Sequence, residues 1–124
     1  MRLSLDDFAK LVQEALDELP DFARPYLEGV VVDVEPMPRA EDCREAEVDD
    51  PRELLGLYHG LPLTERSIED GFRPPDRITI YQRNIERMCG TRQEIVEQVR
   101  TTVLHEIGHH FGLDEDDLEE MGYD

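Results

Sequence analysis

The stretch TTVLHEIGHHFGLDEDD, residues 101–117, holds three of the four histidines of this 124-residue chain and runs directly into a cluster of acids. Upstream of it, Thr91 and Glu94 form a capping box, which predicts the start of a helix. Gly112 is a favourable helix end, because glycine adopts positive φ without strain. Between these points apolar residues recur at helical spacing: Ile95, Val96, Val99, Val103 and Ile107. One long helix is therefore expected to carry the histidines.

The rest of the chain predicts one further long helix and a small sheet. Ser4 and Asp7 form a second capping box, followed by apolar residues at helical spacing up to Pro20. Runs of β-branched or apolar residues predict strands. These runs span residues 30–35, 54–60 and 77–82. The acidic, proline-containing segment 36–52 is expected to be a loop. The order predicts an α+β fold, in which a three-stranded sheet packs with an N-terminal helix and a long C-terminal helix.

The length of the chain suits one domain, residues 1–124. No apolar run approaches the roughly 20 residues of a membrane span. The first residues, MRLSLDDFAK, contain acids where a signal peptide requires an apolar stretch. We therefore expect a cytoplasmic protein, in which Cys43 and Cys89 are free thiols.

The composition is strongly acidic, with 31 acids against 13 bases and a net charge of −18. A negative field repels phosphate backbones and anionic lipids, so neither nucleic acid nor a membrane is an expected partner. The same field would attract cations and basic peptides, although solubility is the simpler explanation of the charge. The sequence predicts no particular oligomeric state.

His105, Glu106 and His109 form the pattern H-E-x-x-H. Residues i and i+4 lie on one face of a helix, so both imidazoles can reach one zinc ion at about 2.0–2.1 Å. At 100° per residue, their common direction lies roughly 140° from the apolar stripe, so the helix can pack on a core and still present both histidines. Glu106 would stay close enough to the ion to take a proton from water. His110 falls on the apolar stripe and is expected to be half-buried, and His59 is expected to be a surface loop residue.

A zinc site needs a third protein ligand, and no histidine follows His110. The pattern continues as H-E-x-x-H-x-x-G-x-x-E, which places Glu115 three residues after Gly112. The glycine allows the chain to reverse and return a carboxylate to the metal. Asp116 and Asp114 are the alternatives to Glu115.

Four stretches of the chain resemble the minimal zincin-like metallopeptidases, a family of small bacterial proteins. They are LVQEALDELP, LLGLYHGLPLTERS, PPDRITIYQRNIE and VLHEIGHHFGLDEDDLEEMGY. The last is similar to the H-E-x-x-H-x-x-G-x-x-D motif of the aspzincins. The resemblance implies one Zn²⁺ per chain, bound by His105, His109 and a third ligand at Glu115, with Glu106 as the catalytic base. Glutamate stands at that third position where the family usually has aspartate.

Three protein ligands would leave one zinc position for water, which is typical of a catalytic site. The expected activity is that of a zinc metallopeptidase, a hydrolase whose peptide or protein substrate pairs with an exposed strand edge at 54–59 or 77–82. Tyr58, Tyr81 and Tyr123 are candidate oxyanion stabilisers by residue type alone. The alternative is a non-catalytic protein that uses the zincin scaffold for metal binding and interaction or regulation. Small size favours that alternative, and the presence of Glu106 favours the enzyme.

Overall fold

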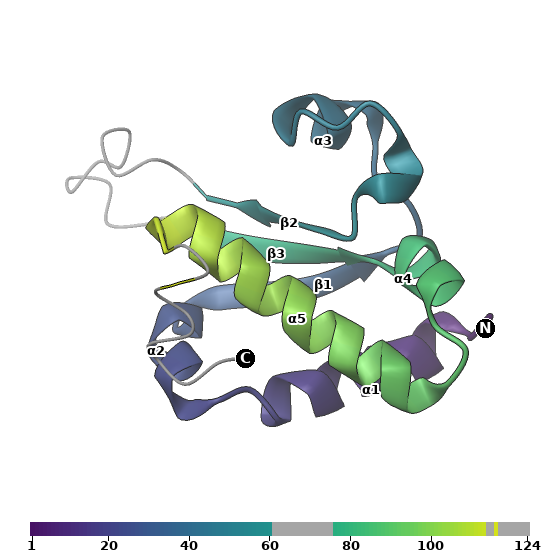
Figure 1. Cartoon of the computed structure of the whole chain (residues 1–124), viewed down its shortest axis with the longest axis horizontal. Helices are drawn as coiled ribbons and strands as arrows, with labels where there is room; N and C mark the ends of the chain where they lie inside the picture. Colours follow the sequence, from purple (N-terminus) through teal and green to yellow (C-terminus); the bar gives the residue numbers. More distant parts are fainter. Residues whose placement is uncertain (61–75, 114–115, 117–124) are drawn as a thin grey trace.

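The computed structural model describes residues 1–60, 76–113 and 116. In this part of the chain, five α-helices and two 3-10 turns accompany a three-stranded sheet (Figure 1). The elements are α1 (Leu5–Asp17), η1 (Asp21–Ala23), α2 (Arg24–Leu27), β1 (Val30–Glu35), α3 (Ala40–Glu45), η2 (Pro51–Glu53), β2 (Gly56–His59), β3 (Asp76–Tyr81), α4 (Gln82–Met88) and α5 (Arg92–Phe111). The predicted α+β class, with helices at both ends of the chain, is confirmed.

The sheet has the order β1-β3-β2. β1 runs parallel to β3, with Val32 opposite Ile78, and β2 runs antiparallel to β3, with Tyr58 opposite Ile78. Because β3 is paired on both sides, the suggestion that residues 77–82 offer a free edge for a substrate is wrong. Among the described strands β2 lies at an edge of the sheet, so pairing of a substrate with residues 54–59 stays a prediction.

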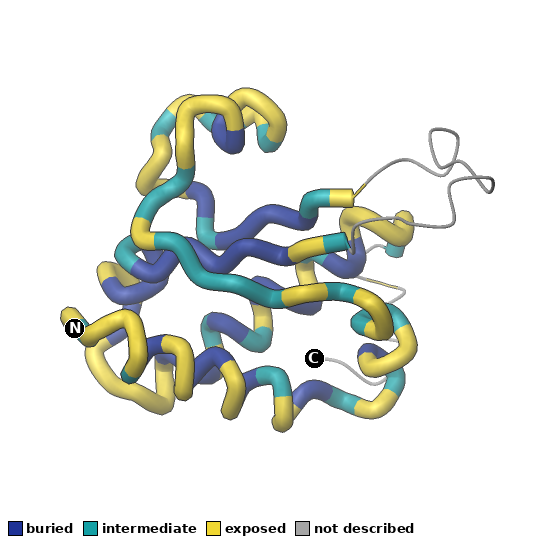
Figure 2. Tube along the Cα trace, turned by 180° about the vertical axis from the view of Figure 1, so that it is seen from behind, coloured by how far each residue is buried: buried dark blue, intermediate teal, exposed yellow. Residues whose placement is uncertain are grey.

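One face of the sheet packs against α5, which crosses it and contacts β2 and β3, and α1 packs alongside α5 (Figure 1). The buried part of the chain runs through the middle of the sheet and along the inner sides of these helices (Figure 2). Both predicted apolar stripes contribute to this core, whose largest fully buried members include Phe8, Ile78, Ile80, Ile85, Ile95, Leu104 and Ile107. Burial of these side chains supplies the main stabilisation of the fold.

The ends of both long helices form as the sequence predicts. The Ser4 hydroxyl accepts a hydrogen bond from the Asp7 backbone N–H at 3.1 Å, and Thr91 accepts one from the Glu94 N–H at 3.1 Å. Each hydroxyl satisfies a donor that lacks a partner within the first turn of its helix. Gly112 ends α5 at φ 72°, in the left-handed conformation that glycine adopts at least cost.

The opposite face of the sheet is partly covered by α3 and η2, which lie within the segment expected to be a loop. That prediction is wrong in part, because aspartates cap both short elements. Asp42 accepts a hydrogen bond from the Arg39 N–H at 3.0 Å, and Asp50 accepts one from the Arg52 N–H at 3.0 Å. A second, small core lies under this segment and contains Ala46, Val48, Leu54, Leu57 and Tyr81.

The two cysteines, Cys43 and Cys89, are buried free thiols, as expected. Among the described residues, no helix has the length and apolar character needed to cross a membrane.

Candidate metal centre

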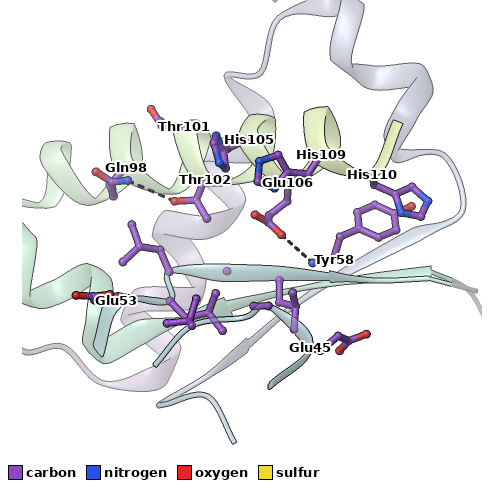
Figure 3. Close-up of a pocket in the computed structure, with 16 residues that line it drawn as sticks. Glu45, Glu53, Tyr58, Gln98, Thr101, Thr102, His105, Glu106, His109 and His110 are labelled. Atoms are coloured by element: carbon purple, nitrogen blue, oxygen red, sulfur yellow. Dashed lines mark hydrogen bonds between the residues drawn. The ribbon is translucent and has the colours of Figure 1, made fainter. Parts of the chain in front are cut away.

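The C-terminal half of α5 brings the predicted motif residues together. One ligand atom each of His105, Glu106 and His109 lies within 4.8 Å of the others. The two imidazole rings have centroids 4.3 Å apart. All three side chains project from α5 towards β2 (Figure 3). Both histidines are exposed, so the pair is open to solvent as well as directed at the sheet edge.

Glu106 is held in place by the edge strand. Its Oε1 accepts a hydrogen bond from the backbone N–H of Tyr58 at 3.1 Å (Figure 3). The pKa of Glu106 is raised, and burial is the largest cause. The hydrogen bond from Tyr58 and the proximity of His109 and His105 lower this pKa, but by less than burial raises it. A carboxyl group in this position has a fixed direction, because one oxygen is bound to the strand and the helix positions its backbone.

The contact between Glu106 and Tyr58 depends on the close approach of β2 to α5 at Gly56. A Cβ at this position would lie 2.7 Å from Thr102 Cγ2 and 3.2 Å from the Thr79 carbonyl oxygen. A side chain larger than hydrogen fits there only if Thr102 or the backbone shifts. The sequence analysis missed this role, although a glycine within a strand is a signal of close backbone approach.

Tyr58 and His110 form an aromatic pair beside the motif. Their rings are stacked, with centroids 3.8 Å apart and an interplanar angle of 13°. The Tyr58 hydroxyl donates a hydrogen bond to Asp76 Oδ2 at 2.9 Å. The prediction of a half-buried His110 is wrong: the residue is exposed, because the last turn of α5 extends past the core and leaves this ring to pack on Tyr58.

Of the tyrosines considered as oxyanion stabilisers, Tyr58 lines the groove, and its hydroxyl bonds to Asp76. Tyr81 is fully buried in the small core on the other face of the sheet, which separates it from the motif. Tyr123 lies outside the described residues. His59 is the last residue of β2, not a loop residue, and its side chain is 26% exposed.

A groove of about 650 Å³ runs between α5 and the edge of β2. Gln98, Thr101 and Thr102 line it from α5, and Glu45 and Glu53 line it from α3 and η2 (Figure 3). The motif residues face into this groove, so a molecule lying along β2 would pass directly beside them.

The third metal ligand is not placed by the structure. Glu115, predicted for this role, and Asp114 lie outside the described residues, whereas Asp116 is described and is exposed. The described donors nevertheless fit a zinc ion, which prefers imidazole nitrogen and accepts carboxylate oxygen. His105 and His109 are the residues that could hold it, with Glu106 adjacent.

A capped helix that presents H-E-x-x-H beside the edge strand of a small sheet defines the zincin-like class of protein. The family model for zincin-like metallopeptidases matches residues 27–123 of the chain. The chain therefore belongs to the zincin-like metallopeptidase family, which implies a zinc cofactor and confirms the resemblance seen in the sequence.

Among solved structures, the chain is similar to a conserved hypothetical protein from Thermus thermophilus. The two share 24% sequence identity, and the match covers 88% of this chain and 94% of the other, with a TM-score of 0.53. At this level of identity the similarity shows the fold alone. No curated protein matches the chain.

Proposed function

We propose that the protein is a zinc-dependent metallopeptidase that hydrolyses peptide bonds. The observation that carries this proposal is the convergence of His105, Glu106 and His109 within 4.8 Å at the wall of an open groove. His105 and His109 would be metal ligands, and Glu115 is proposed as the third. Metal binding alone has no need of a carboxyl group at Glu106, so its place beside both histidines favours chemistry over a purely structural site.

A bound zinc ion supplies Lewis acidity, which lowers the pKa of water towards 7 and polarises a carbonyl group. Glu106 would accept the proton of the attacking water at the carboxylate oxygen that faces the histidines. The same carboxyl group would then donate that proton to the nitrogen of the leaving amine. The hydrogen bond from the Tyr58 N–H would keep the carboxyl group directed at the groove during both transfers.

The groove suits an extended peptide. No other described strand pairs with the outer edge of β2. An edge strand can bind a further strand through its backbone N–H and C=O groups. Among the described residues that line the groove there is no lysine or arginine, while Glu45 and Glu53 contribute carboxylates. We therefore expect neutral or basic peptides to bind better than acidic ones.

The test compares the wild type with Glu106→Gln, each loaded with one equivalent of Zn²⁺, on a library of unstructured peptides read out by mass spectrometry. Loss of a general base lowers turnover by roughly 10²- to 10⁴-fold. Glu97→Gln is the matched control, because Glu97 is an exposed residue of the same helix. We expect this variant to keep wild-type activity.

Two results would contradict the proposal. Equal turnover by wild type and Glu106→Gln would show that cleavage does not use this site. A wild type that binds zinc through His105 and His109 but cleaves no library peptide would favour the non-catalytic alternative. Zinc content is measured separately on each variant, so a loss of metal is distinguished from a loss of the base.

A further inference from the structure

A second group of potential metal ligands lies across β2 from the groove. Asp42, Glu45 and His59 each offer one ligand atom, and these atoms lie within 4.8 Å of one another. The His59 Nδ1 atom is 3.7 Å from Glu45 Oε2. The three side chains line a separate cavity of about 510 Å³.

Two structural features bring these residues together. Asp42 and Glu45 are three residues apart on α3, so they share one face of that helix. His59 ends β2, where alternate side chains point to opposite faces of the sheet. Tyr58 therefore faces α5, and His59 faces α3.

The positive side chains around this cavity are paired with other acids. Arg39 lies 3.6 Å from Glu35 and 3.9 Å from Glu41, and Arg77 lies 3.6 Å from Asp33. In residues 1–60 and 76–113, neither Asp42 nor Glu45 forms an ion pair with an arginine or lysine. Arg39 and Arg77 line the same cavity, but the His59 imidazole is the basic group that lies within ion-pair distance of a carboxylate of the cluster.

Burial in this cluster falls mainly on Asp42, because the Glu45 side chain is 59% exposed. Asp42 is only 9% exposed, and the hydrogen bond that it accepts from Arg39 comes from a neutral backbone N–H. The Tyr81 hydroxyl, which is fully buried, has no partner at hydrogen-bonding distance and angle. Burial raises the pKa of Tyr81, and the negative charge of the adjacent Asp42 carboxylate raises it further. A carboxylate withdrawn from water is costly unless a positive charge compensates it.

We propose that Asp42, Glu45 and His59 bind a second divalent metal ion, separate from the site on α5. One imidazole and two carboxylates are a ligand set for Zn²⁺ or a neighbouring transition metal, with water completing the coordination. The ion would connect α3 to the end of β2 and so stabilise the α3 side of the groove. This second site does not depend on the proposed peptidase activity.

The test uses the full chain, stripped of metal and titrated with Zn²⁺ by calorimetry, with bound metal measured after dialysis. The double variant His105→Ala/His109→Ala should retain about one equivalent of Zn²⁺, and adding His59→Ala to it should abolish that binding. His59→Ala alone should leave only the equivalent bound on α5. Glu45→Gln provides a second test on α3, because Asp42 also caps this helix and its replacement could unfold it.

Glu41→Gln is the matched control, since Glu41 lies on the same short helix and is paired with Arg39. It should bind as much metal as the parent protein. The inference is overturned if the double variant binds no Zn²⁺, or if its bound Zn²⁺ persists after His59→Ala. The first result would leave the cluster as a His59–Glu45 ion pair, and the second would indicate nonspecific binding to the acidic surface.

Discussion

Tyr58 and His59 are neighbours in the chain, yet they belong to opposite faces of the sheet and to different groups of polar residues. The Tyr58 backbone binds Glu106 on the α5 side, whereas the His59 side chain approaches Glu45 on the α3 side. An edge strand lacks a neighbour on one side, so both of its faces are accessible near that edge. A single four-residue strand can therefore contribute to two sites.

The two sides differ in how their polar groups are supported. On the α5 side, a long helix with a deep core places His105 and His109, and both imidazoles remain exposed. On the α3 side, a six-residue helix places Asp42, which is nearly buried. A short helix has little intrinsic stability, so its position depends on tertiary contacts. The α3 side is therefore expected to respond more strongly to loss of its ligands.

The largest expected effect is that of metal removal. At a free metal concentration of about 100 times Kd, each site adds about 2.7 kcal/mol to the free energy of unfolding. Excess chelator should therefore lower the melting temperature of zinc-loaded wild type more than that of zinc-loaded His59→Ala. Differential scanning calorimetry measures this difference. Equal shifts in both proteins would contradict a metal site on the α3 side.

Gly56→Ala tests the close approach on the α5 side. The new methyl group would overlap Thr102 Cγ2, and overpacking of this kind typically costs about 1–3 kcal/mol. Adding Thr102→Ser removes that methyl group and should restore most of the lost stability, measured by urea denaturation. Gly90→Ala is the control, because its Cβ would meet only Glu94 Oε1 at 3.7 Å. A Gly56→Ala protein as stable as the wild type would show that β2 and α5 are not so closely apposed.

A smaller effect is expected for the hydrogen bond between Tyr58 and Asp76. Tyr58→Phe keeps the ring that stacks on His110 but removes the hydroxyl, which should lower the free energy of unfolding by about 1 kcal/mol. A double-mutant cycle with Asp76→Asn isolates this contact from other interactions of either residue. Fully additive changes in the cycle would show that the contact contributes nothing.

The smallest effect is expected for Tyr81→Phe on the α3 side. Removing a buried hydroxyl without a good hydrogen-bond partner should be neutral or stabilising, within about 1 kcal/mol. Together with Tyr58→Phe, this variant compares a tyrosine whose hydroxyl forms a hydrogen bond with one whose hydroxyl does not, on the two faces of one sheet. A loss clearly larger than that of Tyr58→Phe would show that the Tyr81 hydroxyl donates strongly to Asp42.

Several parts of the fold could be predicted because their causes are local. The hydroxyls of Ser4 and Thr91, three residues before an acid, indicate helix starts that the structure confirms. The spacing of His105 and His109 places both imidazoles on one helix face before any tertiary contact is known. The left-handed Gly112 likewise follows from the preference of that residue for positive φ.

Other parts could not be predicted, because they depend on residues far apart in the chain. The sequence predicts residues 77–82 as a strand and a candidate exposed edge, and the central position of β3 follows only from its pairing with both β1 and β2. α3 is short and acidic, and it is stabilised by its Asp42 cap and the small core that follows it. His59 shows no sign of a role until β2 and α3 are placed together.

The sequence by itself determined the long helix, the spacing of its histidines and the acidic side chain between them, since a helical repeat and a capping hydroxyl act within a few residues. Only the tertiary structure decided which strand is central, how closely Gly56 approaches Thr102, and that Tyr58 and His59 face different partners. These features arise from strand pairing and packing between distant segments, whose energies depend on which surfaces meet in the folded chain.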